Sequence, residues 1–184
     1  LRGDGVAPSI LGMNKIIGDD SLRRALSAIA PAPDAKHTDA QRAARIARNL
    51  ERLGLAATIK VADARDIDAW WDGRGFDRIL ADVPCSASGV VRRHPDAKWL
   101  RRESDIAGFA ATQKAIIDAL WRTLVPGGKM LYATCSVFAE ENARQVEAFV
   151  GRHADARYLA MPVDALTHHL PDAEHDGFYY ALLQ

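Results

Sequence analysis

The feature that most constrains the fold is an alternation of short apolar runs with longer segments of helical spacing. Helices are predicted over about 38–53, 104–124 and 140–151, and strands over 57–62, 77–81, 129–133, 158–160 and 178–183. The first helix begins at a capping-box pattern, Thr38 to Gln41, and ends at Gly54. Strands that alternate with helices of this length favour an α/β fold, with a mostly parallel sheet covered by helices on both faces.

The first 37 residues fit this alternation less well. They contain four glycines and a Pro31-Ala32-Pro33 stretch, and only the segment from Ser21 to Ile29 has a pattern that could form a helix. We find no strand followed by a glycine-rich turn there. The sequence therefore predicts a poorly matched segment over 1–37 and one domain over 38–184.

Composition narrows the class of protein. The chain is 48% hydrophobic and 26% charged, and no apolar run approaches the length of a membrane span. The N-terminus has no basic region followed by an apolar core, and two cysteines are more typical of working thiols than of a disulfide framework. Six scattered histidines and no Cys-x-x-Cys argue against a metal site. We expect a cytoplasmic protein without a membrane partner.

The two cysteines lie in separate polar turns, each directly after a predicted strand. Cys85 belongs to the phrase DVPCSASG, which begins at Asp82, and Cys135 belongs to the phrase ATCS. In open α/β sheets, ligands bind beyond the carboxyl ends of the strands. We therefore expect the two sulfurs to lie close together without a bond. The alternative is that both cysteines are small buried hydrophobic residues.

A basic strip, defined here as residues 92–102 with the sequence RRHPDAKWLRR, follows the Cys85 turn. It holds five Lys or Arg residues against one Asp, a net charge of +4 with His94 neutral. Such a run is often only a solvated face. Its position beside a candidate active site indicates a polyanionic substrate. Trp99 within it is either a packing anchor or a platform for stacking bases.

These phrases, together with DGFYYALL near the end of the chain, resemble bacterial RNA cytosine-5 methyltransferases of the Sun family over 38–184. The resemblance implies a Rossmann-like class I methyltransferase fold with an antiparallel last strand. It also implies S-adenosylmethionine as cofactor, and 16S ribosomal RNA as partner, either free or in an early small-subunit particle. The protein is expected to act as a monomer.

The resemblance also implies roles for both thiols. A thiolate adds to C6 of cytosine and makes C5 nucleophilic; after methyl transfer, a base removes the C5 proton and the thiolate leaves. Cys135 would be the nucleophile, and Cys85 would assist the elimination. Asp82 would lie near the methyl donor and the base, and Asp63 near the cofactor's adenine, unless Asp63 is only a strand-end turn residue.

The basic strip would supply the contacts to the RNA backbone. The candidate residues are Arg92, Arg93, Lys98, Arg101 and Arg102.

Two features of the family pattern are missing from the sequence. The first strand with its Ala-Ala-Pro-Gly-Gly-Lys loop cannot be found, and His37 aligns with the acid that would hold the cofactor ribose. Either the enzyme is degenerate, or a segment is absent between Ile29 and Thr38, with Lys36–His37 as the first choice of junction. One competing function is a catalytically silent RNA-binding or ribosome-assembly module. A second is a thiol redox protein, which is less favoured because the two cysteines are 50 residues apart in separate turns.

Overall fold

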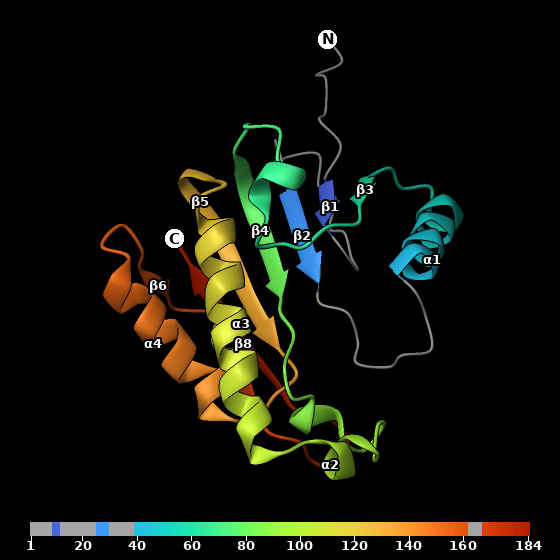
Figure 1. Ribbon diagram of the computed structural model, residues 1–184, viewed down its shortest axis with the longest axis vertical. Helices are drawn as coiled ribbons and strands as arrows, with labels where there is room; N and C mark the ends of the chain where they lie inside the picture. Colours follow the sequence, from blue (N-terminus) through green and yellow to red (C-terminus); the bar gives the residue numbers. More distant parts are fainter. Residues whose placement is uncertain (1–8, 12–24, 30–38, 162–166) are drawn as a thin grey trace. The chain divides into compact units, whose positions relative to one another are not determined.

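The computed structural model describes residues 9–11, 25–29, 39–161 and 167–184. The chain folds as two compact units (Figure 1). The first unit comprises Leu1–Asp82 with Ala119–Met130, and the second comprises Val83–Asp118 with Leu131–Gln184. Within the described residues, no helix is long and apolar enough to cross a membrane.

The first unit contains a parallel sheet with the strand order β3-β1-β2-β4. The strands are β1 (Ser9–Leu11), β2 (Ala25–Ile29), β3 (Thr58–Lys60) and β4 (Phe76–Asp82). All four carboxyl ends therefore lie at one edge of this sheet, where open α/β folds bind their ligands. A short 3-10 helix, Ile67–Ala69, precedes β4.

Strands β1 and β2 correct our expectation for the N-terminal segment. From the sequence, Ser21–Ile29 could form a helix and no strand followed by a glycine-rich turn was found before residue 38, whereas Ala25–Ile29 is a strand paired with β1 and β4. A short apolar run is compatible with either structure, and here the pairing with neighbouring strands decides between them. The Lys36–His37 junction, where we expected a missing segment with the glycine-rich loop, lies outside the described residues.

Helix α1 (Asp39–Leu53) packs on β3. Its buried residues Ile46 and Leu50 contact Ala57 and Ile59, as the helical spacing predicted. Gly54 ends the helix with φ +65°, a left-handed conformation that glycine adopts without strain. Thr38, which opens the predicted capping box, lies outside the described residues.

Helix α3 (Glu103–Trp121) ends three residues earlier than predicted, and β5 (Leu124–Thr134) begins before the Pro126-Gly127-Gly128 turn that we expected to stop the helix. Thr123 explains the difference. Both its backbone N–H and its hydroxyl donate to the Leu120 carbonyl, and its own carbonyl accepts from Phe76 N–H at the start of β4. Threonine thus replaces the next helical turn with a strand contact.

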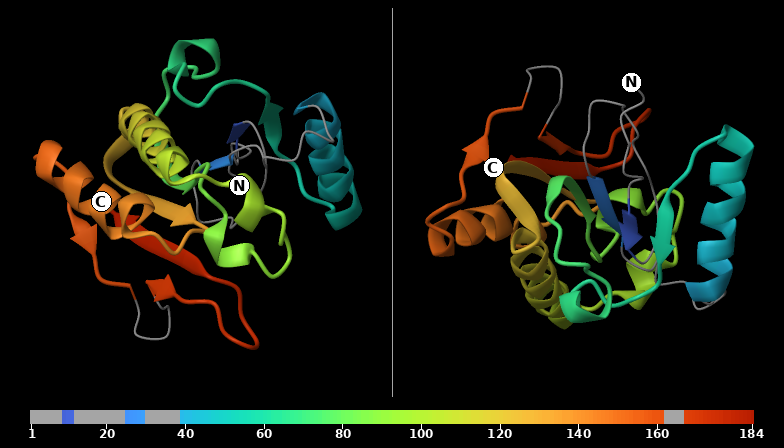
Figure 2. Two further views of the ribbon diagram at one scale, coloured as in Figure 1. Left: turned by 60° about the horizontal axis from the view of Figure 1, so that its bottom comes forward. Right: turned by 90° about the horizontal axis from the view of Figure 1, so that it is seen from above.

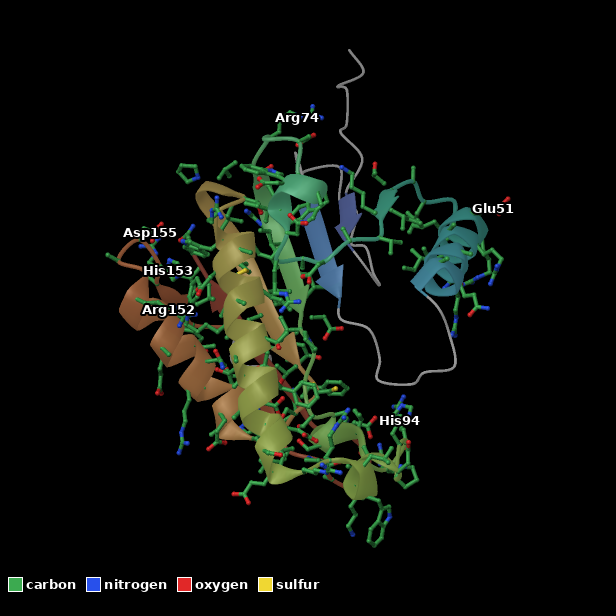
Figure 3. All side chains as sticks on the ribbon, viewed as in Figure 1. Glu51, Arg74, His94, Arg152, His153 and Asp155 are labelled. Carbon is green, nitrogen blue, oxygen red and sulfur yellow. The ribbon has the colours of Figure 1, made fainter. Side chains whose placement is uncertain are left out.

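In the second unit, α3 and α4 (Ala143–Arg152) run side by side (Figures 1 and 2). Asp118 on α3 accepts hydrogen bonds from Arg152 and contacts His153 at 2.9 Å, both labelled in Figure 3, and these partners lower its pKa against the opposing effect of burial. The Gln145 side chain donates to the Ala110 carbonyl. Polar contacts therefore hold both ends of α4 against α3.

The second unit also holds the end of the chain. Strand β8 (Phe178–Leu183) pairs antiparallel with β6 (Tyr158–Leu159) and with β7 (His168–His169), so the antiparallel last strand is confirmed. The remaining short elements are α2 (Ala97–Leu100) and two 3-10 helices, Ser88–Val90 and Ala139–Glu141.

Candidate active site

The two cysteine turns lie against each other within the second unit. The sulfurs of Cys85 and Cys135 are 3.3 Å apart, and both thiols are free. Backbone hydrogen bonds join the turns on either side of the sulfurs, from Val83 N–H to the Ala133 carbonyl and from Gly89 N–H to the Cys135 carbonyl. The expectation of two close, unbonded thiols is confirmed.

The environments of the two thiols differ. Cys85 is buried, whereas Cys135 is partly exposed. The hydrogen bond with Cys135, together with burial, raises the pKa of the Cys85 thiol. Cys85 therefore keeps its proton at neutral pH and can donate it to a neighbouring thiolate, which is the nucleophilic form of cysteine.

The DVPCSASG and DGFYYALL phrases need a glycine at Gly89 and at Gly177 because the two backbones approach each other closely there. Gly177 N–H donates to the Gly89 carbonyl at 2.7 Å. A Cβ added at Gly89 would lie 2.2 Å from the Gly177 carbonyl oxygen and 2.9 Å from that of Cys135. Only glycine lets the backbones approach this closely, and the approach fixes the end of the Cys85 turn against the DGFYYALL segment and against the Cys135 turn.

A buried polar network surrounds the residues that follow the cysteines. Glu141 is fully buried and accepts hydrogen bonds from Ser86 and Ser136, one residue beyond Cys85 and Cys135. Gln113 of α3 donates both to Glu141 and to the Pro84 carbonyl. Our sequence reasoning missed these residues. A signal existed for Gln113, a polar residue four positions after Phe109 on the predicted apolar face of α3.

Asn142 belongs to the same network and interrupts the helix predicted over 140–151. Its side-chain oxygen accepts from the Thr134 hydroxyl, and its amide donates to the Ser136 carbonyl. Because these contacts hold Asn142 at φ −119° and ψ −108°, the segment splits into a 3-10 helix before it and α4 after it.

The two candidate aspartates, Asp63 and Asp82, belong to the first unit. Asp82 ends β4 and is partly buried, and burial raises its pKa to about 6. Asp63 follows β3 and is half-exposed; Arg65 binds both of its carboxylate oxygens and lowers its pKa. Both residues thus follow strands at the carboxyl edge of the parallel sheet.

Some side chains of the basic strip contact the loops of the second unit, and others face outward. Arg92 and Arg93 form ion pairs with the buried carboxylate of Asp176, and Arg92 also donates to the Ala173 carbonyl. Arg101 donates to the Ser86 carbonyl and lies over the Phe109 ring. These three arginines hold the loops around the site.

The rest of the strip faces outward. Lys98 and Arg102 are exposed, and His94 lies in the exposed turn before α2 (Figure 3). Trp99 is 82% exposed, with the Lys98 ammonium over its ring, so it is not a packing anchor within the described part of the chain.

A pocket of about 230 Å³ opens beside the basic strip. Its lining comprises Arg93, His169, Glu174, His175, Asp176, Phe178 and Tyr180. The Phe178 and Tyr180 rings stack with centroids 6.2 Å apart. Neither cysteine lines this pocket. The described residues hold no cluster of three metal-ligating side chains.

Solved structures are similar to this chain over almost its whole length. A methyltransferase homologue from Pyrococcus horikoshii is 21% identical, with a TM-score of 0.69 over 97% of this chain and 61% of its own. NSun6 from the same organism, crystallised with SFG, is 24% identical, with a TM-score of 0.66 over 95% of this chain and 47% of its own. The chain has the Rossmann-like class I methyltransferase fold, as expected.

Curated relatives are much closer in sequence. Ribosomal RNA small subunit methyltransferase B of Vibrio cholerae is 52% identical over 147 residues, which cover 79% of this chain and 34% of the relative. Its counterpart from Erwinia tasmaniensis is 52% identical over 162 residues, or 83% of this chain and 37% of the relative. The chain thus spans about a third of the length of these relatives.

The model of a single family, described as 16S rRNA methyltransferase RsmB/F, matches residues 30–184. The match covers both cysteine turns, both candidate aspartates and the basic strip. This chain therefore belongs to the RsmB/F family of 16S rRNA methyltransferases.

Proposed function

We propose that the protein transfers a methyl group from S-adenosylmethionine to C5 of a cytosine in 16S ribosomal RNA. The observation that carries this proposal is the pair of unbonded thiols 3.3 Å apart at the ends of two strands. Methylation at a ring carbon needs a nucleophile at the adjacent carbon, which a cysteine thiolate supplies. Family membership supports the ribosomal RNA substrate.

Cys135 is the nucleophile in this proposal, and Cys85 assists release of the product. Cys135 is the more exposed thiol, so a base can reach it, while the raised pKa of Cys85 keeps that thiol protonated beside it. After methyl transfer a base removes the C5 proton, and the electron pair of that C–H bond forms the C5–C6 double bond as the C6–S bond breaks. The S–H group of Cys85 donates a hydrogen bond to the departing Cys135 thiolate and so assists its release from C6. The two roles require both thiols within contact distance.

The first unit would hold the methyl donor. Its four parallel strands end at one edge, and Asp63 and Asp82 follow two of those strands. A partly buried carboxyl such as Asp82 suits a ligand that brings its own hydrogen-bond donors, as the amino groups of cytosine and of the cofactor do. When bound, S-adenosylmethionine supplies an electrophilic methyl group on a sulfonium. Asp63 would exchange its Arg65 contact for the adenine side of the cofactor.

The basic strip would bind the RNA backbone, with Lys98 and Arg102 as the most accessible cations. We propose that the substrate is 16S RNA, either free or in an early small-subunit particle, and that the protein acts as a monomer in the cytoplasm. Arg92, Arg93 and Arg101 contribute to this surface while holding the loops beneath it.

The direct test measures transfer of a labelled methyl group from S-adenosylmethionine to unmodified 16S RNA by the intact protein and by Cys135→Ala. We expect 5-methylcytosine with the first and none with the second, while RNA affinity stays unchanged. Tight RNA binding without methyl transfer by either protein would support the silent RNA-binding module instead. Methyl transfer at an atom other than C5 would contradict the two-thiol chemistry.

A further inference from the structure

Glu141 is a carboxylate with no exposed surface, held in the second unit between the two cysteine turns. A buried carboxylate is costly unless hydrogen bonds replace its hydration. Here four donors do so. Oε1 accepts from Ser86 N–H at 2.8 Å and from the Gln113 amide at 3.1 Å, and Oε2 accepts from the hydroxyls of Ser86 and Ser136 at 2.6 and 2.5 Å.

The serines that Glu141 binds are the residues directly after the two cysteines. Ser86 follows Cys85 and Ser136 follows Cys135, so one side chain bridges two turns that are 50 residues apart in sequence. The serine hydroxyls are also 3.2 Å from each other. A shift of the Glu141 side chain would therefore move both turns and change the separation of the sulfurs.

The surrounding contacts keep Glu141 itself in place. The Tyr132 hydroxyl donates to the Glu141 carbonyl at 2.6 Å, and Gln113 also donates to the Pro84 carbonyl next to Cys85. Ser88 extends the bridge, because its hydroxyl accepts from Val137 N–H beyond the second turn. Tyr132, Gln113 and Ser88 therefore hold Glu141 and the residues beside the two cysteines in place.

We propose that Glu141 is a positioning residue that sets the distance between the two thiols in the methyl-transfer reaction. It contacts the residue after each cysteine, and no described contact joins it to either sulfur. The part of the proposal that concerns reaction rests on the proposed function. The part that concerns thiol distance does not, so each part can fail independently of the other.

Two substitutions at Glu141 should disturb the distance between the thiols to different extents, Glu141→Gln less than Glu141→Ala. Glutamine keeps the shape and one carbonyl oxygen for Ser86 N–H, and its amide can donate to the two serine hydroxyls, which are also acceptors. Alanine leaves Ser86 N–H without its side-chain acceptor and removes one of the two acceptors of the Gln113 amide, which keeps the Pro84 carbonyl. Glu140 provides a matched control, because it is exposed and pairs with Arg144 on the surface.

The thiol distance can be tested by chemical oxidation. Diamide, a diazene, accepts two electrons and two protons from the two thiols, becoming a hydrazine as a Cys85–Cys135 disulfide forms. In the first step one thiolate adds to the N=N bond of diamide and forms an S–N bond. In the second step the other thiolate attacks that sulfur, so that the S–S bond forms, the S–N bond breaks and the hydrazine leaves; this step depends on the proximity of the two cysteines. In the intact protein, alkylation and mass spectrometry should find this step slowed about tenfold or more in Glu141→Ala, about threefold or less in Glu141→Gln, and unchanged in Glu140→Gln.

Should Glu141→Ala fail to fold by circular dichroism, Ser136→Ala removes one arm of the bridge and leaves only one backbone donor, Phe138 N–H, without its acceptor. It should slow the same step about threefold. Disulfide formation at the unaltered rate in a folded Glu141→Ala or Ser136→Ala protein would overturn the proposal.

Steady-state methylation then tests the reaction. For Glu141→Ala we expect kcat to fall about 100-fold with little change in KM for RNA, and Glu141→Gln to recover most of the rate. An equal fall in the amount of active enzyme, with kcat per folded molecule unchanged, would mean a structural role only. If the unaltered protein transfers no methyl group, the proposed function fails, while the oxidation result still decides whether Glu141 sets the thiol distance.

Discussion

In the second unit, the polar groups around the two cysteines form hydrogen bonds with one another. In the first unit, by contrast, a contact within a local turn lowers the pKa of Asp63, and burial raises the pKa of Asp82. Glu141, Gln113 and the serines form hydrogen bonds that cross from one cysteine turn to the other. Asp63 contacts Arg65, only two residues away. The cysteine turns of the second unit are therefore organised by hydrogen bonds within the protein, whereas the two aspartates of the first unit are suited to complete their contacts with ligands.

The largest effect should come from Gly89, where the second unit is most tightly closed. In Gly89→Ala the new Cβ would lie 2.2 Å from the Gly177 carbonyl oxygen, so the turn must move. We expect a loss of about 3 kcal/mol in the free energy of unfolding and loss of methyl transfer. Urea denaturation measures the first and the labelled-methyl assay the second.

The matched control is Gly108→Ala on α3, where an added Cβ meets nothing within 4 Å. That change should raise stability by about 0.5–1 kcal/mol, because alanine is the better helix former. Equal changes in the free energy of unfolding for Gly89→Ala and Gly108→Ala would contradict the difference between a crowded turn and an open helix face.

Asp82 should give the next largest effect, with a pH dependence of defined sign. Its pKa is raised to about 6, so the folded state binds the proton more tightly than the unfolded state does. This contribution to stability is full below about pH 4 and is lost as pH rises through 6. Asp82→Asn should therefore raise the free energy of unfolding by about 2 kcal/mol at pH 7.5 and by almost nothing at pH 4.

Urea denaturation at the two pH values measures this difference, with Asp68→Asn, an exposed aspartate of the same unit, as control. Methyl transfer by Asp82→Asn should fall even as stability rises, since the carboxylate would contact the base or the cofactor. A destabilised Asp82→Asn protein at pH 7.5 would contradict the assignment of burial as the cause of the raised pKa.

The basic strip should yield a smaller effect, on RNA binding. Lys98→Ala with Arg102→Ala should weaken binding to many RNAs alike and lower the slope of log K against log salt by about 2, or about 0.9 for each phosphate contact. Arg101→Ala should also reduce stability, because it holds the Ser86 carbonyl. An unchanged slope after the double substitution, measured by fluorescence anisotropy, would move the RNA surface elsewhere.

Asp63 should give the smallest change in stability. Its ion pair with Arg65 is exposed, and such pairs contribute about 0–1 kcal/mol, so Asp63→Asn should alter the unfolding free energy by less than about 0.5 kcal/mol. Affinity for S-adenosylhomocysteine, measured by calorimetry, should nevertheless fall. If the affinity is unchanged, Asp63 is only the strand-end turn residue.

The sequence predicted the local parts of this molecule better than the contacts between distant parts. Helix α1, strand β4 and the pairing of Cys85 with Cys135 followed from periodicity and from where apolar runs end. The possible helix over Ser21–Ile29 was wrong, because Ala25–Ile29 is a strand whose structure depends on its neighbours in the sheet. The role of Thr123 in ending α3 depends in the same way on β4.

The buried carboxylate of Glu141 could not be predicted for a related reason. Periodicity placed it in the first turn of a surface helix, where acids are common. Its burial arises from Ser86, 55 residues earlier in the chain, and from Gln113 on another helix. The network around the cysteines is a tertiary property, and only its cysteines carry a recognisable motif.

The most direct test of the two-thiol account is covalent capture of RNA by single-cysteine variants. The intact protein, Cys135→Ala and Cys85→Ala are incubated with unmodified 16S RNA and S-adenosylmethionine and run on a denaturing gel. We expect no slow-migrating adduct with Cys135→Ala and an accumulating protein–RNA adduct with Cys85→Ala, because the nucleophile remains but its release is impaired. An adduct that accumulates with Cys135→Ala and is absent with Cys85→Ala would contradict the assignment of Cys135 as the nucleophile.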